Sequence, residues 1–225
     1  MSERWRTEPE FTIKVDPSLV LLGVLLEPAT VVTKALEHVA EIGRRSLWEP
    51  RKVPVTGAGP IGLLAALIAR QYGKEVHVLD RMVSGPKPEA VRALGATYHS
   101  GSVTAIGFEP DAIIECTGVR QLIAESIQTV GASGIVCLTG VGHGGIVTSV
   151  DDADIAAAVV LKNNVIVGSV NANKRHWYRA GEFLARADRA WLARLISRRV
   201  RPKDFMSALE RKPDDIKVLI QFSDA

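Results

Sequence analysis

The stretch Val53-Pro54-Val55-Thr56-Gly57-Ala58-Gly59-Pro60-Ile61-Gly62 decides the fold of this chain. It predicts a short strand, a glycine turn and then a helix that carries the apolar residues 63–69. Glycines spaced as Gly57, Gly59 and Gly62 suit a turn around a pyrophosphate. One makes the tight turn, one lets the backbone approach the phosphates, and one lets helix and strand pack closely. A purely structural turn is the alternative interpretation.

The next strand, residues 75–79, supports the first interpretation because it ends in Asp80. An acid at about 20 residues beyond the glycine motif is expected to bind a ribose. The Asp80 carboxylate would accept a hydrogen bond from the 2′-hydroxyl of NAD and repel a 2′-phosphate, whereas Arg81 could pair with the 2′-phosphate of NADP. We therefore predict a nucleotide-binding βαβ unit, favour NAD and keep NADP as the alternative.

Short apolar strands alternate with helices through the middle of the chain. The expected strands are residues 53–56, 75–79, 97–99, 111–116, 134–138 and 165–170, and the expected helices are residues 60–72, 88–94, 120–130 and 151–161. Apolar strands between helices indicate a parallel sheet that is covered on both faces. The predicted fold class is α/β, a doubly wound, Rossmann-like parallel sheet with a C-terminal helical and strand extension.

The two ends of the chain differ from this middle part. Residues 1–18 are polar and are expected to be loose, and a helix is expected over residues 29–42, with Pro28 in its first turn, Glu27 as a cap and Gly43 as its stop. Helices are expected at 177–187, 191–199 and 203–211. A last strand, residues 216–222, is too distant to assign to the main sheet. The predicted units are 1–43, 44–172 and 173–225.

Pro54 conflicts with the expected central strand. Proline cannot donate to a strand ladder and is normally confined to edges, strand starts or bulges. Either the strand starts at Val55, or the proline destabilises it.

Composition favours a cytoplasmic protein without a nucleic-acid or membrane partner. The 225 residues are 47% hydrophobic and 24% charged, with a net charge of +3 that requires no polyanion. Cys116 and Cys137 lie in apolar segments and read as core thiols in a reducing compartment. The longest apolar stretch, residues 19–26, is too short to span a bilayer. Twelve basic and four acidic residues between Lys174 and Lys212 suggest solvated helix faces, since no nucleic-acid-reading motif accompanies them.

Four short motifs together resemble the zinc-dependent, medium-chain alcohol dehydrogenase superfamily, and its glucose dehydrogenase branch in particular. They are Val55-Thr56-Gly57-Ala58-Gly59-Pro60-Ile61-Gly62, Ile114-Glu115-Cys116-Thr117-Gly118, Leu138-Thr139-Gly140-Val141 and Gly168-Ser169-Val170-Asn171. Leu25-Leu26-Glu27-Pro28 and the apolar end of the chain add to the likeness. The resemblance implies oxidation of a sugar or alcohol hydroxyl, with hydride passing to a nicotinamide cofactor.

The resemblance also implies roles for particular residues. The pyrophosphate would be held by Gly57, Gly59, Pro60, Ile61 and Gly62, the adenosine ribose by Asp80 and Arg81, and the nicotinamide side by Thr139, Gly140, Val141, Ser169, Val170 and Asn171. Asn171 and Glu27 would also contact the substrate, and Glu27 matches a glutamate at or beside the catalytic zinc.

The chain departs from the resemblance at the zinc. The family's other ligands are a Cys or Asp followed later by a His-Glu pair, and this sequence has no His-Glu dipeptide. Because a catalytic zinc needs about three protein ligands, Glu27 alone is not a zinc site. We therefore interpret the chain as the C-terminal, NAD(P)-binding half of such a dehydrogenase, inactive alone; a non-catalytic nucleotide-binding remnant is the alternative.

Three smaller expectations complete this interpretation. Surface that a catalytic domain would cover is apolar here, which favours a homo-oligomer. His143 in Gly142-His143-Gly144-Gly145 is expected to be a turn residue, and His176 beside Trp177 a packing or surface residue.

Overall fold

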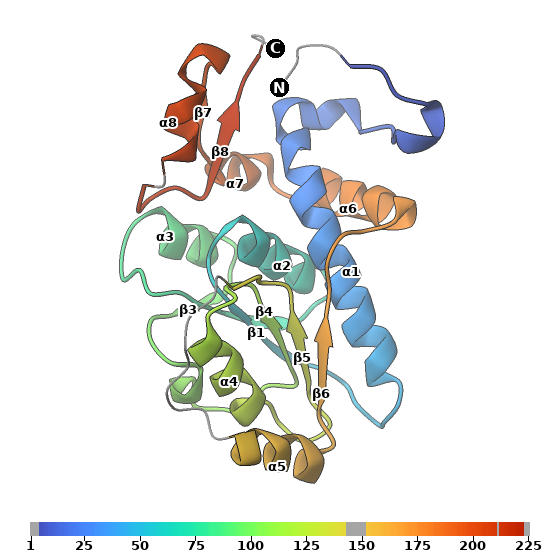
Figure 1. Ribbon diagram of the computed structural model, residues 1–225, viewed down its shortest axis with the longest axis vertical. Helices are drawn as coiled ribbons and strands as arrows, with labels where there is room; N and C mark the ends of the chain where they lie inside the picture. Colours follow the sequence, from blue (N-terminus) through green and yellow to red (C-terminus); the bar gives the residue numbers. More distant parts are fainter. Residues whose placement is uncertain (1–4, 143–151, 211, 223–225) are drawn as a thin grey trace.

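The computed structural model describes residues 5–142, 152–210 and 212–222, and its main body is a six-stranded parallel sheet (Figure 1). The strands are β1 (Lys52–Thr56), β2 (Glu75–Leu79), β3 (Thr97–His99), β4 (Ala112–Glu115), β5 (Ile135–Leu138) and β6 (Val165–Gly168). Their spatial order is β3-β2-β1-β4-β5-β6, so the winding direction reverses between β1 and β4. This confirms the predicted doubly wound, Rossmann-like sheet, in which ligands bind at the carboxyl ends of the strands beside that reversal.

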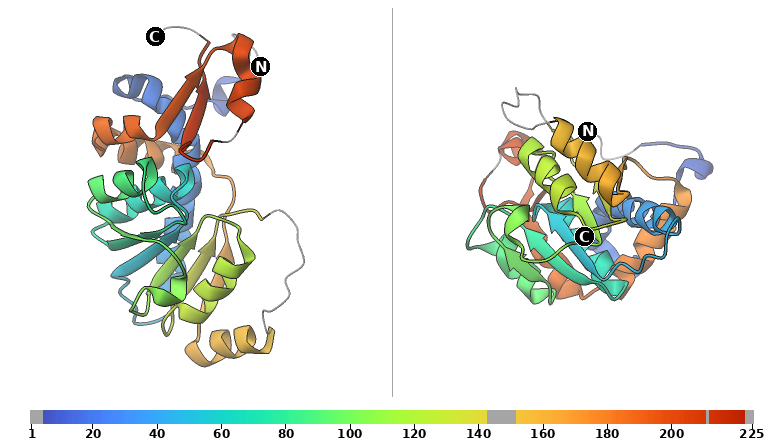
Figure 2. Two further views of the ribbon diagram at one scale, coloured as in Figure 1. Left: turned by 90° about the vertical axis from the view of Figure 1, so that its left-hand side faces the viewer. Right: turned by 90° about the horizontal axis from the view of Figure 1, so that it is seen from below.

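Helices cover both faces of the sheet (Figure 2). One face carries α1 (Leu26–Gly43), α2 (Pro60–Gln71) and α3 (Pro86–Ala93), and the other carries α4 (Arg120–Thr129) and α5 (Asp152–Lys162). Neighbouring residues of β4 show the alternation, because Ile114 belongs to the first core and Ile113 to the second. Both side chains are fully buried.

Helix α1 begins at Leu26, three residues earlier than expected, and ends at Gly43 as predicted. Leu25 occupies the N-cap position, so the prediction that Glu27 caps the helix is wrong. A 3-10 segment, η2 (Pro17–Leu25), runs directly into α1. The combined segment Pro17–Gly43 is long and apolar enough to cross a membrane. The apolar run of residues 19–26 alone does not indicate this, because the apolar residues of α1 continue the segment. In the structure, 56% of the most apolar 18-residue stretch of this segment is buried inside the protein. Ala29, Val32 and Ala35 lie fully inside the core.

Pro54 lies inside β1, so the prediction of a strand starting at Val55 is wrong. Carbonyl oxygens of Lys52 and Thr56 accept hydrogen bonds from the β4 side. Because alternate residues of a parallel strand face opposite neighbours, the backbone nitrogen of Pro54 also faces β4. β1 pairs with β2 from Lys52 onward, but with β4 only from Val55 onward. The missing N–H therefore shortens one ladder and leaves the other complete.

The C-terminal part contains a second, smaller sheet. Its elements are α6 (Lys174–Arg186), α7 (Arg189–Arg194), β7 (Ile196–Val200), α8 (Phe205–Leu209) and β8 (Lys217–Ile220), and the short 3-10 turns of the chain are η1 (Pro9–Phe11), η3 (Val103–Ala105) and η4 (Pro202–Asp204). β7 and β8 pair in parallel as a two-stranded sheet. The predicted helix over residues 191–199 is wrong beyond Arg194, because the alternating residues of β7 form a strand instead. Arg198 in β7 and Asp215 form an ion pair at 2.7 Å.

Candidate dinucleotide site

The glycine loop lies between the carboxyl end of β1 and the first turn of α2. The N–H of Gly57 donates to the carbonyl of Leu79 at 2.6 Å, which attaches the loop to the end of β2. Gly59 is the N-cap of α2 and Pro60 its first residue, and no side chain of the described residues caps this helix. The amides of Ile61 and Gly62 therefore sit in a first turn that has no intrahelical acceptors, where a helix attracts anions.

The glycines of this loop are required for two different reasons. A Cβ on Gly62 would overlap the carbonyl oxygen of Gly57. A Cβ on Gly57 would lie 2.9 Å from Thr117 Cγ2, on a backbone whose φ of +89° disfavours side chains. Gly59 has ordinary extended backbone, and nothing in the described structure lies within 4 Å of its Cβ position. Packing requires glycine at 57 and 62, whereas at 59 it only keeps the space in front of the helix open.

Asp80 connects the end of β2 to the glycine loop. Its Oδ2 accepts from the N–H of Ala58 at 2.7 Å, and its Oδ1 accepts from the N–H of Met82 at 3.2 Å. These bonds bring the predicted ribose acid to the predicted pyrophosphate loop. Arg81 follows with an exposed side chain.

Tyr98 of β3 supports this corner of the site, and the sequence offered no feature that singles it out. Its hydroxyl donates to the carbonyl oxygen of Met82 and lies 3.3 Å from that of Asp80. Burial, with the charge of Asp80 adding to it, raises the pKa of Tyr98 to about 12. The phenol therefore stays a hydrogen-bond donor at neutral pH and holds the Asp80–Met82 turn.

Glu115, at the end of β4, is a fully buried carboxylate beneath the loop. It accepts from Thr56 Oγ1 at 3.1 Å, from the N–H of Thr117 at 2.7 Å and from the N–H of Gly118 at 3.0 Å, and also from the Thr117 hydroxyl. Several donors make its burial tolerable. The motif around Glu115 contributes to the resemblance, but nothing in the sequence assigns this residue a role. The feature of the sequence that could have indicated its role is an acidic residue at the end of an apolar strand.

The loop after β5 packs against Glu115 and the turn that follows it. Thr139 donates from its N–H to the Glu115 carbonyl at 2.8 Å and from Oγ1 at 2.9 Å. A Cβ on Gly140 would overlap the backbone of Gly118, so the two loops touch. Val141 is 80% exposed and projects away from the core. Cys116 lies beneath Thr139, and burial raises the pKa of its thiol to about 12.

The segment after β6 forms the last part of the predicted site. The N–H of Ser169 donates to Leu138 at 2.9 Å, and the buried Ser169 Oγ has no hydrogen-bond partner among the described residues. Lys34 of α1 donates to the carbonyl of Val170 at 2.9 Å, a contact that the sequence did not reveal. Asn171 is exposed, with left-handed backbone at φ +56°.

Glu27 is exposed in the first turn of α1. Within the ranges that the structure describes, no group of three or more His, Cys, Asp or Glu residues could hold a metal ion. The residues described here therefore do not form a zinc site around Glu27.

The two histidines named from the sequence have different outcomes. His143 lies outside the described residues. His176 is buried at the start of α6, where it forms a capping box with Asn173 and lies 3.4 Å from Glu37, which confirms a packing role.

Comparison with known proteins identifies the family. The family model described as glucose dehydrogenase C-terminus matches residues 20–222. The chain belongs to this family. The resemblance to the glucose dehydrogenase branch of the zinc-dependent medium-chain dehydrogenases is thereby confirmed.

The chain aligns over nearly its whole length with relatives in this family. The chain is 36% identical to glucose 1-dehydrogenase of Methanocella arvoryzae, covering 98% of this chain and 64% of that protein. It is also 36% identical to glucose 1-dehydrogenase 2 of Vulcanisaeta moutnovskia, covering 96% of this chain and 63% of that one. The chain thus spans a little under two thirds of the length of the curated relatives it matches.

Solved structures agree with this assignment. Glucose dehydrogenase of Haloferax mediterranei, in complex with NADP, Zn and gluconolactone, superposes with a TM-score of 0.89 at 26% identity. That match covers 97% of this chain and 64% of the other. An alcohol dehydrogenase of Thermotoga maritima, at a TM-score of 0.73 and 23% identity, shares the fold.

Proposed function

We propose that this chain binds a nicotinamide dinucleotide along the carboxyl edge of the sheet. The observation that carries the proposal is the open space at Gly59, between two glycines that packing requires. A side chain there would fill the place of a pyrophosphate in front of the α2 N-terminus. The buried Ser169 Oγ, which has no partner within the described part of the chain, lies at the far end of the same edge and supports a polar ligand that reaches that far.

Each part of the dinucleotide has a proposed set of partners. The pyrophosphate would meet the loop of Gly57, Gly59, Pro60, Ile61 and Gly62, and the adenosine ribose would meet Asp80 and Arg81. The nicotinamide side would be lined by Thr139, Gly140, Val141, Ser169, Val170 and Asn171. Lys34 would hold the Val170 carbonyl, and so the segment that faces the nicotinamide.

Asp80 favours NAD over NADP. Its two oxygens already accept backbone N–H groups, but a carboxylate keeps lone pairs for the ribose hydroxyls and repels a 2′-phosphate. The Haloferax mediterranei relative was solved with NADP, so both cofactors belong in the test.

The proposed reaction is that of an oxidoreductase acting on CH–OH groups. Relatives named glucose 1-dehydrogenase support transfer of hydride from a sugar or alcohol hydroxyl to the nicotinamide, which is the chemistry that this cofactor supplies when bound. Glu27 lies seven residues before Lys34, and two turns of helix place both on one stripe of α1 about 10 Å apart. Glu27 and Asn171 would thus face substrate beyond the nicotinamide.

The described residues do not fit a zinc ion, because no three His, Cys, Asp or Glu side chains come together among them. We propose that turnover requires ligands supplied by a zinc-binding domain and that this chain alone does not catalyse it. A non-catalytic nucleotide-binding protein is the second candidate. Zinc held in stoichiometric amount together with glucose-dependent reduction of NAD(P) would rule that candidate out.

Three organisational proposals accompany this function. The units 1–43, 44–172 and 173–225 are supported by the separate β7–β8 sheet of the last unit. A homo-oligomer is supported by exposed apolar residues of the edge strand β6 and of the preceding helix α5, namely Ile166, Val160 and Leu161. A cytoplasmic location is supported by two free cysteines, Cys116 and Cys137.

Isothermal titration with NAD and with NADP tests the cofactor site. Gly59→Ala should weaken both cofactors by at least about tenfold without loss of folding, because its Cβ meets only the ligand. Asp80→Ala should weaken NAD more than NADP. Gly181→Ala in α6 is the matched control, since its Cβ finds nothing nearer than 3.9 Å. Unchanged affinity in Gly59→Ala, or no binding at millimolar cofactor, would refute the site.

A further inference from the structure

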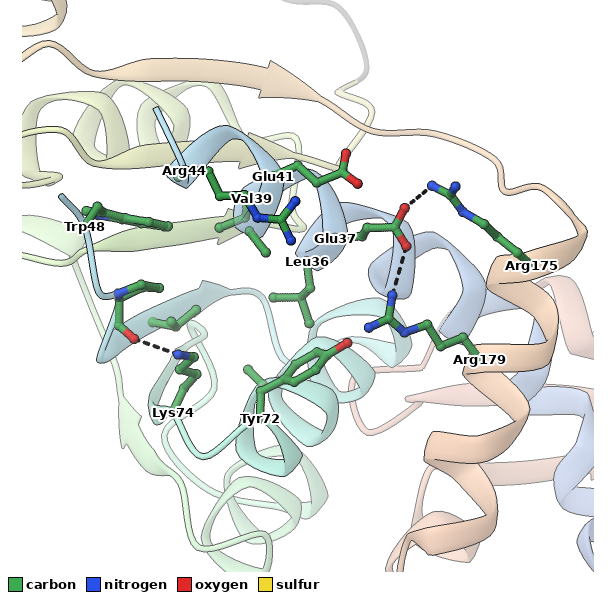
Figure 3. Close-up of a pocket in the computed structure, with 15 residues that line it drawn as sticks. Leu36, Glu37, Val39, Glu41, Arg44, Trp48, Tyr72, Lys74, Arg175 and Arg179 are labelled. Carbon is green, nitrogen blue, oxygen red and sulfur yellow. Dashed lines mark hydrogen bonds and ion pairs between the residues drawn. The ribbon is translucent and has the colours of Figure 1, made fainter. Parts of the chain in front are cut away.

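A hollow of about 600 Å³ lies at the opposite end of β1 from the glycine loop (Figure 3). The second half of α1, the end of α2 and the start of α6 surround it, and Val53 lines it at the beginning of β1. Its volume is within the range of small-molecule sites. None of the residues assigned to the dinucleotide lines it.

Two aromatic side chains, one from the loop between α1 and β1 and one from the residue after α2, stand at the sides of this hollow. Figure 3 shows Trp48 and Tyr72 with Leu36 between them. The Trp48 ring packs against the end of α1 so closely that a Cβ on Gly43 would overlap it. Tyr72 meets the Phe183 ring edge-on, with centroids 5.2 Å apart. Neighbours hold both rings in place, so a flat apolar ligand would find preformed walls.

Charged side chains at the rim favour an anion. Four cations and two carboxylates line the hollow. Glu37 forms ion pairs with Arg175 and Arg179. Burial opposes ionisation of Glu37, but the His176 hydrogen bond and the two arginines outweigh it and hold its pKa below the ordinary value. Lys74 donates to the carbonyl of Pro50 at 2.9 Å.

Among the described cations that line the hollow, Arg44 is the one whose side chain is not paired with another group. Figure 3 shows its guanidinium extending over the hollow, with Glu41 directed elsewhere. In the part of the chain that the structure describes, the Arg44 side chain has no hydrogen bond and no ion pair. A planar guanidinium with free donors binds a carboxylate by two parallel hydrogen bonds.

We propose that this hollow is a second ligand site, which binds a small organic anion with a flat aromatic body. The carboxylate pairs with Arg44, and the ring lies on the apolar floor between Trp48 and Tyr72. The site is separate from the dinucleotide site, so the two ligands bind at the same time. The proposal does not depend on the proposed function.

Equilibrium dialysis with 2-naphthoate tests the proposal on the whole chain. We expect saturable binding of one molecule per chain, unaffected by saturating NAD or NADP. Arg44→Met should weaken it by about tenfold, the loss expected for a charge-assisted pair, while Arg44→Lys should weaken it less. The uncharged 2-naphthol should bind more weakly than the acid. Arg194→Met, an exposed arginine in the last turn of α7, is the matched control.

Three results would overturn the proposal. They are the absence of saturable binding, equal affinity in the wild type and in Arg44→Met, and displacement of the probe by either dinucleotide. The last result would place the aromatic anion in the cofactor site instead. Trp48→Leu gives an independent check. It removes one aromatic wall of the hollow without changing the charge, and it should also weaken the binding of 2-naphthoate.

Discussion

Single residues decide whether the loops at the carboxyl edge of the sheet can meet. Glu115 is the clearest case, since its carboxylate is fully buried and accepts hydrogen bonds from the end of β1 and from the turn after β4. The sequence places an acid at the end of β4 but cannot show which donors turn towards it. Those donors come from β1 and from the turn after β4, which only the parallel pairing brings together.

Replacing Glu115 with glutamine should destabilise the fold. The new amide turns an N–H₂ group towards N–H and O–H donors, and an unpaired buried donor costs about 1–3 kcal/mol. Urea unfolding of Glu115→Gln measures this loss. Glu89→Gln, on the exposed face of α3, should change the free energy of unfolding very little, and equal stability in the two variants would contradict the role of Glu115.

The glycines of the loop should separate folding from binding. Gly62→Ala forces a Cβ onto the Gly57 carbonyl and should lower the midpoint of thermal unfolding. Gly59→Ala should leave that midpoint near the wild-type value and affect only the cofactor. Differential scanning calorimetry of both variants measures the contrast, and an equal drop in both would mean that Gly59 is also a packing residue.

At the level of elements, strand patterns in the middle of the chain were predictable and the C-terminal part was less so. The main strands are short runs next to turns, mostly apolar except for β3 (Thr97–His99), and all six of them form. The sequence predicts residues 196–199 as the end of a helix, because isoleucine and arginine are compatible with either structure. Pairing with β8 selects the strand, and a partner about twenty residues away is invisible to local pattern.

The β2–β3 pair should make stability depend on pH. His77 Nδ1 and His99 Nε2 lie 2.8 Å apart, and Glu75 lies 2.9 Å from the other nitrogen of His77. Burial, with the charge of His77 adding to it, holds the pKa of His99 below 6.5. The unfolded state therefore takes up the proton first, so stability is complete above pH 6.5 and falls as the pH drops through the lower folded-state pKa.

Chemical denaturation at a series of pH values checks this slope. His99→Gln should flatten it between pH 6.5 and about 5, where most carboxylates are still ionised. Asp215 does not interfere, because its hydrogen bond with Arg198 lowers the pKa of that carboxyl to about 2. A slope that persists unchanged in His99→Gln would assign it to another group.

Over the whole molecule, the sheet has a free edge at β6. Val160 and Leu161 at the end of α5 are 72% and 81% exposed, and Ile166 of β6 is 39% exposed. An open strand edge with apolar neighbours is a pairing surface. The expected homo-oligomer would therefore form along this edge.

Light scattering coupled to size-exclusion chromatography tests that expectation. The wild type should elute as a dimer or larger species, and Leu161→Lys with Ile166→Lys should shift it towards the monomer, since two buried charges would oppose the contact. Leu47→Lys, an exposed apolar residue elsewhere, should not change the mass. A wild-type monomer at high concentration would contradict the oligomer.

The sequence by itself determined the parallel α/β sheet, the glycine loop and the acid that follows β2, because strand length, apolar patterning and turn residues are local properties. It also contained the motifs that place the chain in its family. Only the tertiary structure decided that Glu115, Tyr98 and Lys34 hold the loops of the site, and that Arg44 lies over a hollow with no side-chain partner among the described residues. These are contacts between elements distant in sequence, and only the packing of the finished sheet and helices brings them together.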